Sequence, residues 1–385
     1  MSVYITVKQS PKYKQMTLED LLFNEFDQSQ CKICSNYTNT RTYEMEKVPE
    51  KFLSKIDVDS MIQKLKDFND STKSLRECED RSSLYTTFPI PKRSGGLRRI
   101  DAPNPELMDA LRRLKTIFED DFHVLYHTSA FAYIKGRCAV DAMKRHQYNK
   151  SKWFAKLDLH NFFGSTTLEY VINNLSIIFP FNEIMKSEVG KKELVTALEL
   201  GFLNGGLPQG TPLSPTLTNI MMIPVDYKLS NMFRSFNNQK FVYTRYADDF
   251  QISSRYDFDI SEIESALVET LDSFTSPFSV NKEKTRYGSS SGRNWNLGVM
   301  LNKDNEITVG HKKKKVFKSM LHNYITDRNA GIKWNIEDIR TLLGLHAYYR
   351  SVERDNIDAL VQYVNMKHNT DVIKMLLEDL LNNSK

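Results

Sequence analysis

Two adjacent acids between strand-forming runs constrain the fold more than any other feature of this sequence. Residues 240–254 are rich in aromatic and β-branched side chains, and only Asp248 and Asp249 interrupt the run. A tight hairpin over this segment would lift both carboxylates to the edge of a sheet. Because adjacent like charges repel, such a pair is tolerated cheaply only in water or beside a cation. On the dipeptide alone, the simpler interpretation is a solvated turn, since aspartate is a good turn residue.

A third acid changes that balance. Asp158 lies 90 residues upstream of Asp248, late in another strand-like run. Three carboxylates on neighbouring strands would make an oxygen-only site suited to Mg²⁺, which takes its remaining ligands from water and phosphates. Two such ions about 3.5–4 Å apart would activate an attacking hydroxyl and stabilise the leaving oxygen in phosphoryl transfer. The pattern indicates such a site, although spacing alone does not establish it.

The rest of the sequence predicts a mixed architecture. Strands are expected at residues 153–159, 240–254, 296–301 and 307–309. Helices are expected between them, for example over residues 261–274, and another helix begins after an Asn104 cap. Strands that alternate with helices in this way predict an α+β sheet domain. After residue 312, apolar side chains recur at helical spacing, which predicts a helical C-terminal subdomain.

Composition excludes several other classes. The longest apolar stretches fall far short of the ~20 residues that a membrane-spanning helix needs, and the N-terminus lacks the layout of a secretory signal. Four cysteines in 385 residues make no disulfide framework, so we expect a reducing, cytoplasmic location and no membrane partner. Cys31 and Cys34 form half of a zinc pattern, but no second pair exists at ligand spacing. The net charge of +5 barely favours a nucleic-acid partner by itself.

Three motifs carry a resemblance to a known family. Tyr246-Ala247-Asp248-Asp249 resembles the active-site box of reverse transcriptases. Residues 207–215, Leu-Pro-Gln-Gly-Thr-Pro-Leu-Ser-Pro, resemble their template- and nucleotide-positioning motif, and residues 156–163 resemble the strand with the first catalytic aspartate. The motifs stand in the family's order within roughly residues 87–310. The sequence is therefore identified as similar to bacterial reverse transcriptases of the retron and group II intron type.

The resemblance implies a fold and an activity. The expected fold is an α+β right-hand polymerase with fingers, an RRM-like antiparallel palm sheet and a helical thumb. The implied activity is RNA-directed DNA polymerase, a nucleotidyltransferase that extends a primer with deoxynucleoside triphosphates along an RNA template. The expected segments are an N-terminal extension at 1–85, fingers at 86–150 with part of 165–205, a palm at 151–310 and a thumb at 311–385.

The resemblance also implies roles for individual residues. The catalytic residues would be Asp158, Asp248 and Asp249. Two Mg²⁺ ions, for which Mn²⁺ could substitute, would be bound at Asp158, Leu159, Asp248 and Asp249. The nucleotide would be bound by Lys92, Arg98, Arg99, Phe163, Gln209, Gly210 and Lys284. Template and primer would be bound by Arg137, Leu297, Gly298, Lys312, Lys313, Lys314 and Lys315.

Phe163 has two interpretations. It lies five positions after Asp158, where the family places the aromatic residue beneath the sugar. A bulky ring there would clash with a ribose 2′-hydroxyl, which predicts selection of deoxynucleotides. The alternative is an ordinary core phenylalanine beside Phe162.

The type of reverse transcriptase is argued from absences. By its length we expect neither a ribonuclease domain nor the segments that intron maturases add. The Pro-Gln-Gly motif is intact, whereas diversity-generating retroelement enzymes typically depart from it. The Val-Thr-Gly triplet of retron enzymes is not found where residues 296–298 stand, nor is their Asn-Ala-x-x-His signature. We therefore expect a compact enzyme resembling the defence-associated reverse transcriptases of bacteria, which work with a non-coding RNA and restrict phage.

Several alternatives stay open. The primer could be RNA, DNA or a protein hydroxyl, the product would be cDNA, and an accessory protein or a homo-oligomer could take part. The same palm could support template-independent or protein-primed nucleotidyl transfer, or a retron or mobile retroelement without a defence role. A non-catalytic scaffold is disfavoured because all three carboxylates are present. Phe163 and Ala247 disfavour an RNA-dependent RNA polymerase.

Overall fold

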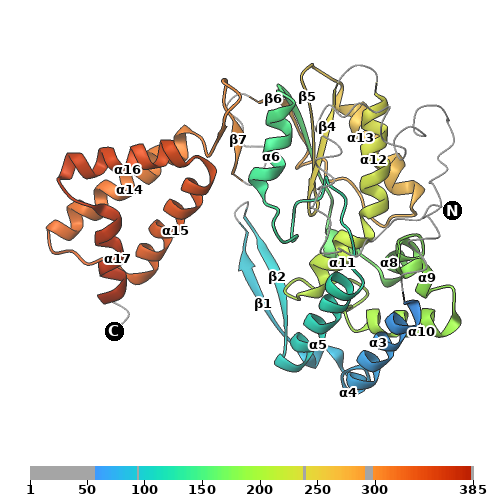
Figure 1. The fold of residues 1–385 in the computed structure, drawn as a ribbon. Helices are drawn as coiled ribbons and strands as arrows, with labels where there is room; N and C mark the ends of the chain where they lie inside the picture. The colour runs from blue at the N-terminus through green and yellow to red at the C-terminus, as the bar shows by residue number, and fades with distance from the viewer. Residues whose placement is uncertain (1–56, 93–94, 237–239, 291–297, 383–385) are drawn as a thin grey trace.

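The computed structural model describes residues 57–92, 95–236, 240–290 and 298–382 (Figure 1). Cys31, Cys34 and Leu297 lie outside these ranges. Figure 1 shows one body that contains a sheet and most of the helices, with the C-terminal helices grouped to one side. The described residues thus combine helix and sheet, as the α+β prediction requires.

A four-stranded sheet forms the centre of the larger body. Its strands are β3 (Trp153–Asp158), β4 (Val242–Tyr246), β5 (Asp249–Ser254) and β6 (Arg286–Ser289). They lie in the order β4-β5-β3-β6, and every neighbouring pair is antiparallel. The hairpin expected around the paired acids is present as β4 and β5.

The third predicted strand is a correction. Of the predicted range, the structure describes residues 298–301; there Met300–Leu301 (β7) is strand and pairs with β8 (Ile307–Thr308) in a separate two-stranded sheet. The fourth strand of the central sheet is instead β6, which no sequence signal indicated. β6 is four residues long and is held by its pairing with β3.

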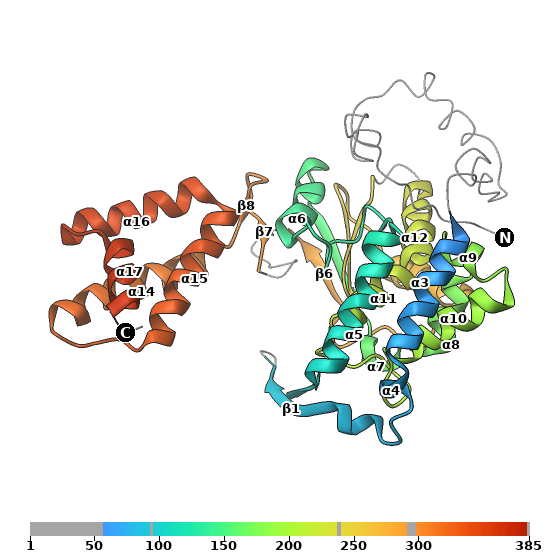
Figure 2. The same ribbon diagram turned by 60° about the horizontal axis from the view of Figure 1, so that its bottom comes forward.

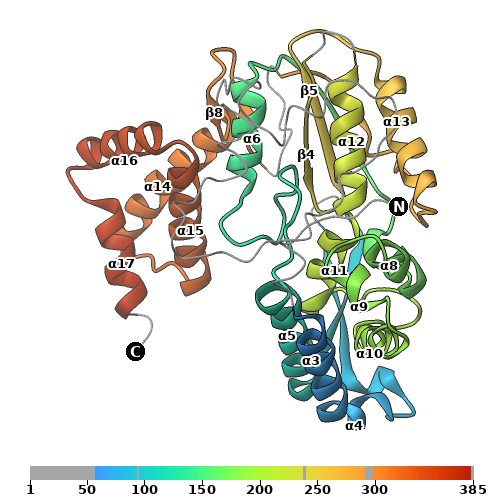
Figure 3. The ribbon, with the colours of Figure 1, turned by 45° about the vertical axis from the view of Figure 1, so that its right-hand side comes forward.

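Helices cover both faces of the central sheet. Strand alternation turns Leu157, Phe250 and Ile252 into the main core, where they pack with α11 (Leu213–Met221), α12 (Ile223–Ser235) and α13 (Ile260–Ser273). On the opposite face lies α6 (Ala139–Tyr148). His146 of α6 is fully buried there, and its ring nitrogens lie 2.6 and 2.8 Å from the hydroxyls of Ser253 and Thr244. Figure 3 shows α12 and α13 beside the sheet, with α6 on its other side.

A long hairpin projects from the larger body. It consists of β1 (Tyr85–Pro91) and β2 (Leu97–Pro103), and it extends on the same side as the C-terminal helices (Figure 2). Asn104 caps the following helix, α5 (Pro105–Thr116), by accepting a hydrogen bond from the Leu107 N–H, as predicted. The other elements of this body are α3 (Val58–Ser71), α4 (Lys73–Arg76), η2 (Arg81–Leu84), η3 (Ile117–Asp121), α7 (Phe162–Ser165), α8 (Leu168–Leu175), α9 (Phe181–Ile184) and α10 (Glu188–Glu199).

The C-terminal helices form a second body with its own core, which confirms the helical prediction. They are α14 (His311–Asn329), α15 (Ile336–Val352), α16 (Arg354–His368) and α17 (Val372–Asn382). Phe317, Leu321, Leu342, Val364 and Leu376 are buried between them. Across the part of the chain described here, no helix is both long enough and apolar enough to span a membrane.

Candidate active site

Three aspartates meet at one edge of the central sheet. Asp158, the last residue of β3, pairs in register with Asp249, the first residue of β5. Ala247 and Asp248 form the turn between β4 and β5, and Ala247 adopts a left-handed conformation with φ of 58°. The two-residue turn therefore places Asp248 beside the Asp158–Asp249 pair.

The three carboxylates lie close enough that each disfavours the ionised form of its neighbours. Burial raises the pKa of Asp248 to about 6, and the carboxylates of Asp249 and Asp158 add to the effect. Burial also raises the pKa of Asp249, with Lys156 acting in the opposite direction. A divalent cation would relieve this crowding, and carboxylate oxygens are the ligands that Mg²⁺ prefers. The donor set therefore fits such an ion.

Two lysines bind the aspartates in this structure. Lys284 Nζ lies 2.8 Å from Asp158 Oδ1, and Lys156 Nζ lies 2.6 Å from Asp249 Oδ2. Among the residues with described positions, no three His, Cys, Asp or Glu side chains are arranged to hold a metal ion. A cation bound by all three carboxylates would therefore have to compete with these lysines.

The segment that carries Lys284 is fastened to the end of β3. The Asn281 N–H donates to the Asp158 carbonyl at 2.7 Å, and the His160 N–H donates to the Ser279 carbonyl at 2.9 Å. Burial acts to lower the pKa of Lys284, but the hydrogen bond to Asp158 and the nearby aspartate charges outweigh it and raise the pKa. Lys284 thus keeps its positive charge beside the carboxylates.

Phe163 lies on α7, five residues after Asp158, and packs partly against the main core. It is half-buried, and its ring meets that of Tyr133 edge-on, with 6.5 Å between centroids. Tyr133 is half-exposed and has φ of 58°. Burial and the charge of Asp248 raise the pKa of the Tyr133 hydroxyl, while Arg98 opposes the rise. Tyr133 therefore lies beside Phe163 and within the electrostatic reach of Asp248.

The Gln209–Gly210 turn is pressed against the projecting hairpin. The Asp101 N–H of β2 donates to the Gln209 carbonyl at 2.7 Å. Gly210 has φ of 119°, and a Cβ there would lie 2.9 Å from Ile100 Cγ2 and 3.0 Å from the Asp101 carbonyl oxygen. Only glycine fits so close an approach in this conformation.

The basic residues of the hairpin face different surroundings. Arg98 acts on Tyr133, as described above, whereas the Arg99 Nε donates to Asp101 Oδ1 at 2.8 Å. Lys92 is exposed at the tip, where its N–H bonds the Gly96 carbonyl. Arg99 is thus paired with Asp101, whereas the charge of Arg98 acts on the Tyr133 hydroxyl.

Two residues expected to contact template or primer make hydrogen bonds within the chain in this structure. Arg137 Nη1 donates to the carbonyls of His127 and Ala130 at 2.7 and 2.8 Å. Lys313 Nζ donates to the Gly298 carbonyl at 2.9 Å.

The other lysines at the start of α14 have different surroundings. Lys314 Nζ lies 2.7 Å from Glu353 Oε2, whereas Lys312 and Lys315 are exposed. The four consecutive lysines therefore do not present one surface.

Sequence reasoning missed Tyr133, Lys156 and Arg245. Lys156 could have been found, because strand alternation places it on the same face as Asp158 two residues later. Arg245 precedes the paired acids by three residues and is fully buried. Nothing in its local pattern distinguishes it from a solvent-facing arginine.

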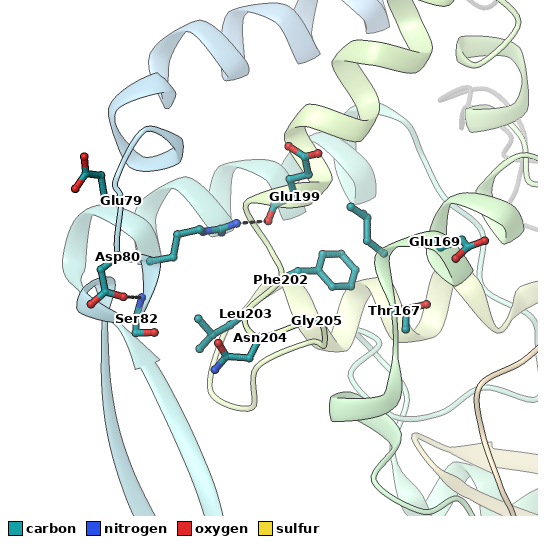
Figure 4. Close-up of a pocket in the computed structure, with 12 residues that line it drawn as sticks. Glu79, Asp80, Ser82, Thr167, Glu169, Glu199, Phe202, Leu203, Asn204 and Gly205 are labelled. Carbon is teal, nitrogen blue, oxygen red and sulfur yellow. Dashed lines mark hydrogen bonds between the residues drawn. The ribbon is translucent and has the colours of Figure 1, made fainter.

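A separate groove of about 680 Å³ lies away from the aspartates (Figure 4). Its lining includes Asp80, Glu169, Phe202 and Asn204, and none of the site residues expected from the sequence. Arg81 Nη1 donates to the Glu199 carbonyl at its edge, so it caps the end of α10. The groove adds nothing to the aspartate cluster.

Comparisons with known proteins identify the family. The model of the family described as reverse transcriptase (RNA-dependent DNA polymerase) matches residues 90–317. The chain is 27% identical over 329 residues to the retron Ec83 reverse transcriptase of Escherichia coli, covering 83% of this chain and 97% of that protein. It is 26% identical over 300 residues to the retron Mx65 reverse transcriptase of Myxococcus xanthus, covering 75% and 66% respectively. The chain is therefore similar to retron reverse transcriptases although it lacks the Val-Thr-Gly triplet.

Among solved structures, the chain is similar to an apo telomerase from Candida tropicalis truncated from its C-terminal domain. The TM-score is 0.41 at 14% identity, and the match covers 63% of this chain and 59% of that one. The described residues combine helix and sheet, which is consistent with a right-hand polymerase fold. Since the family match at residues 90–317 covers more than half of the chain, the chain belongs to the reverse transcriptase family and is an RNA-directed DNA polymerase.

Proposed function

We propose that Asp158, Asp248 and Asp249 form the catalytic centre at which this reverse transcriptase extends a primer 3′-hydroxyl. The observation that carries the proposal is the register of Asp158 with Asp249, with Asp248 on the adjoining turn. These carboxylates, together with Leu159 at the end of β3, would hold two Mg²⁺ ions, for which Mn²⁺ could substitute. When bound, such ions supply positive charge for the attacking hydroxyl and the leaving oxygen.

The nucleotide would lie between the palm edge and the fingers hairpin. The half-buried ring of Phe163 would exclude a ribose 2′-hydroxyl, and the Gln209–Gly210 turn would support the base pair. Arg98 would neutralise the triphosphate, with Lys92 and Arg99 as weaker contributors. Lys284 remains charged and reaches Asp158, which supports a role at the pyrophosphate.

Template and primer would follow the palm toward the thumb. We propose contacts from Arg137, Leu297, Gly298, Lys312, Lys313, Lys314 and Lys315, with the exposed Lys312 and Lys315 bearing most directly on phosphates. We also propose the segment bounds 1–85 for the extension, 86–150 with part of 165–205 for the fingers, 151–310 for the palm and 311–385 for the thumb. The start of α14 at His311 and the separate core of α14–α17 support the last of these.

The test is to purify the protein with its bound nucleic acid, add labelled deoxynucleotides and Mg²⁺, and sequence the RNA and the product. Asp248→Ala is expected to abolish synthesis, while Asp272→Ala, which alters an exposed acid on α13, serves as the control. Product that is complementary to a discrete bound RNA supports the proposal. Product without an RNA complement would favour template-independent or protein-primed transfer.

We propose further that the template is a non-coding RNA and that the enzyme acts in anti-phage defence. This step rests on the resemblance of the sequence to compact defence-associated enzymes, whereas the similarity to retron reverse transcriptases supports the polymerase activity alone. Phage plating efficiency would be compared between cells with the intact locus and cells with Asp248→Ala. Equal plating on both would contradict the defence role and favour a mobile retroelement.

A further inference from the structure

A buried ion pair lies directly beneath the catalytic turn. Arg245 of β4 and Asp226 of α12 are both 0% exposed. Arg245 Nε and Nη2 donate to the two Asp226 oxygens at 2.8 and 2.7 Å, and the Tyr243 hydroxyl donates to Asp226 Oδ1 at 2.6 Å. Desolvating two charges is costly, and a pair of apolar residues can often replace such a pair without loss of stability. Stability alone therefore gives little reason for an arginine here.

The remaining guanidinium nitrogen of Arg245, Nη1, contacts the turn between β4 and β5. Arg245 Nη1 donates to the carbonyl of Ala247 at 3.1 Å and lies 3.2 Å from Asn219 Oδ1. Ala247 immediately precedes Asp248 and has φ of 58°, a conformation that non-glycine residues keep only where their surroundings hold it. An apolar replacement would leave this carbonyl without its donor.

A second hydrogen bond holds the other side of Asp248. The Leu159 N–H at the end of β3 donates to the Asp248 carbonyl at 3.2 Å. The peptides before and after Asp248 are thus fastened separately, one to Arg245 and one to the strand that carries Asp158. Together they fix the backbone from which the Asp248 carboxylate extends.

Arg245 is itself held on several sides. Its N–H donates to the Ser129 carbonyl at 2.6 Å, and its carbonyl accepts from the Phe131 N–H at 2.9 Å. Asn219, which contacts its guanidinium, donates to the Ala132 carbonyl at 2.7 Å. The guanidinium therefore lies in a fixed frame built from α11, α12 and residues 129–132.

We propose that Arg245, held by Asp226, is a positioning residue that fixes the Ala247–Asp248 peptide and so the direction of the Asp248 carboxylate. The inference rests on the proposed catalytic role of Asp248. It requires that removing the pair lowers turnover and metal affinity by more than any loss of folded protein explains.

The decisive variant is the double substitution Arg245→Met with Asp226→Leu, which removes both charges together. We expect a melting temperature near that of the wild type, kcat lower by on the order of a hundredfold, and an unchanged KM for deoxynucleotides. Mn²⁺ binding, followed by electron paramagnetic resonance without nucleotide, should weaken. Arg245→Lys is the second variant: it keeps the charge but cannot span both Asp226 oxygens and the Ala247 carbonyl, so it should show the same kinetic loss.

The control is Arg328→Met with Asp379→Leu, a thumb pair with hydrogen bonds of 2.9 and 3.0 Å. It should leave kcat and Mn²⁺ affinity unchanged. Wild-type kcat and Mn²⁺ affinity in either Arg245 variant, or a loss that only follows the folded fraction, would overturn the proposal. Asp248→Ala is measured alongside, because full activity in that variant would refute the catalytic assignment itself, whatever the Arg245 variants do.

Discussion

At the scale of single residues, the aspartate cluster combines two demands that oppose each other. Asp248 must be ionised to bind a cation, yet burial and two neighbouring carboxylates favour its protonated form. The fold accepts this because strands β3 and β5 pair with Asp158 opposite Asp249. The site should therefore gain stability whenever a charge is removed or neutralised.

This strain predicts that Asp248→Asn stabilises the metal-free protein at about pH 8. The pKa of Asp248 is raised from 3.8 to about 6 in the folded protein, so the folded state binds the proton more tightly than the unfolded chain. The resulting stability is present at low pH and is lost as pH rises through about 6. The ionised carboxylate then costs up to roughly 3 kcal/mol, which asparagine avoids. Melting temperatures measured in a chelator from about pH 4 to 8 should show a gain that shrinks toward pH 4.

Adding Mg²⁺ supplies the complementary result. The ion should raise the melting temperature of the wild type and leave Asp248→Asn nearly unchanged, because binding to the folded state alone stabilises it. Asp272→Asn removes an exposed charge and should behave like the wild type throughout. If Asp248→Asn were no more stable than the wild type at about pH 8, Asp248 would not be strained as described.

The sequence was sufficient to predict that the three aspartates lie close together, but not which basic residues contact them or the turn that carries Asp248. Paired acids between strand-forming runs predict a hairpin, and register then brings Asp158 to Asp249. Arg245 and Lys156 were missed, because an arginine or lysine in a strand gives no local sign of whether it faces solvent or an acid. Asp226, the partner of Arg245, lies on a helix 19 residues earlier in the chain. Such pairings are decided only by tertiary packing.

At the scale of elements, the tightest constraint is the contact between the Gln209–Gly210 turn and strand β2. Gly210→Ala would place a Cβ 3.0 Å from the backbone oxygen of Asp101, at a φ of 119° that alanine rarely adopts. We expect a loss of roughly 1–3 kcal/mol in stability together with a raised KM for deoxynucleotides, because the turn would move from the fingers. Thermal melting and steady-state kinetics check both.

Gly205→Ala is the matched control for this prediction. Gly205 lies in the same loop with φ of 82°, but no atom lies within 4 Å of its Cβ position. It should lose stability from backbone strain and keep its KM. An equal rise of KM in both variants would mean that strain, not contact with the fingers, explains the effect.

Some helices and strands were predicted from the sequence and others were not, and the difference has a physical reason. The β4–β5 hairpin and the C-terminal helices have strong local periodicity, and both are present. β6 has only four residues and is held by β3, which lies more than a hundred residues earlier in the chain, so its local sequence carries little signal. The strand expected at residues 296–301 has a real hairpin partner in β8, but the pair forms its own sheet.

At the scale of the whole molecule, the palm and thumb have separate apolar cores. Their junction has apolar and polar contacts: Val352 of α15 packs against the thumb core and against a smaller palm-side cluster that includes Phe154 and Leu301. Glu353, between α15 and α16, accepts hydrogen bonds from the Thr308 hydroxyl and the Val309 N–H of the palm side, both at 2.9 Å, and pairs with Lys314. These polar contacts and the apolar packing of Val352 together fix the thumb relative to the palm.

This division predicts different effects for the lysines of α14. Lys312→Ala and Lys315→Ala remove exposed charges, so each should weaken primer–template binding and reduce the slope of log affinity against log salt by about 1. Lys314→Ala should leave that slope nearly unchanged, since its ammonium is already neutralised by Glu353 at 2.7 Å. It should instead lower stability by about 1–3 kcal/mol, because a buried carboxylate loses a charged partner, and shorten the products made per binding event as the thumb loosens.

Binding titrations over a range of salt concentrations, melting curves and product lengths under single-binding conditions separate the two groups. Glu353→Gln provides the reciprocal test, since it removes the same ion pair from the other side and should reproduce the phenotype of Lys314→Ala without touching a nucleic-acid contact. If Lys314→Ala instead reduced the salt slope as much as Lys312→Ala, all these lysines would contact phosphates in the working complex. The ion pair with Glu353 would then have to open whenever the primer–template duplex binds.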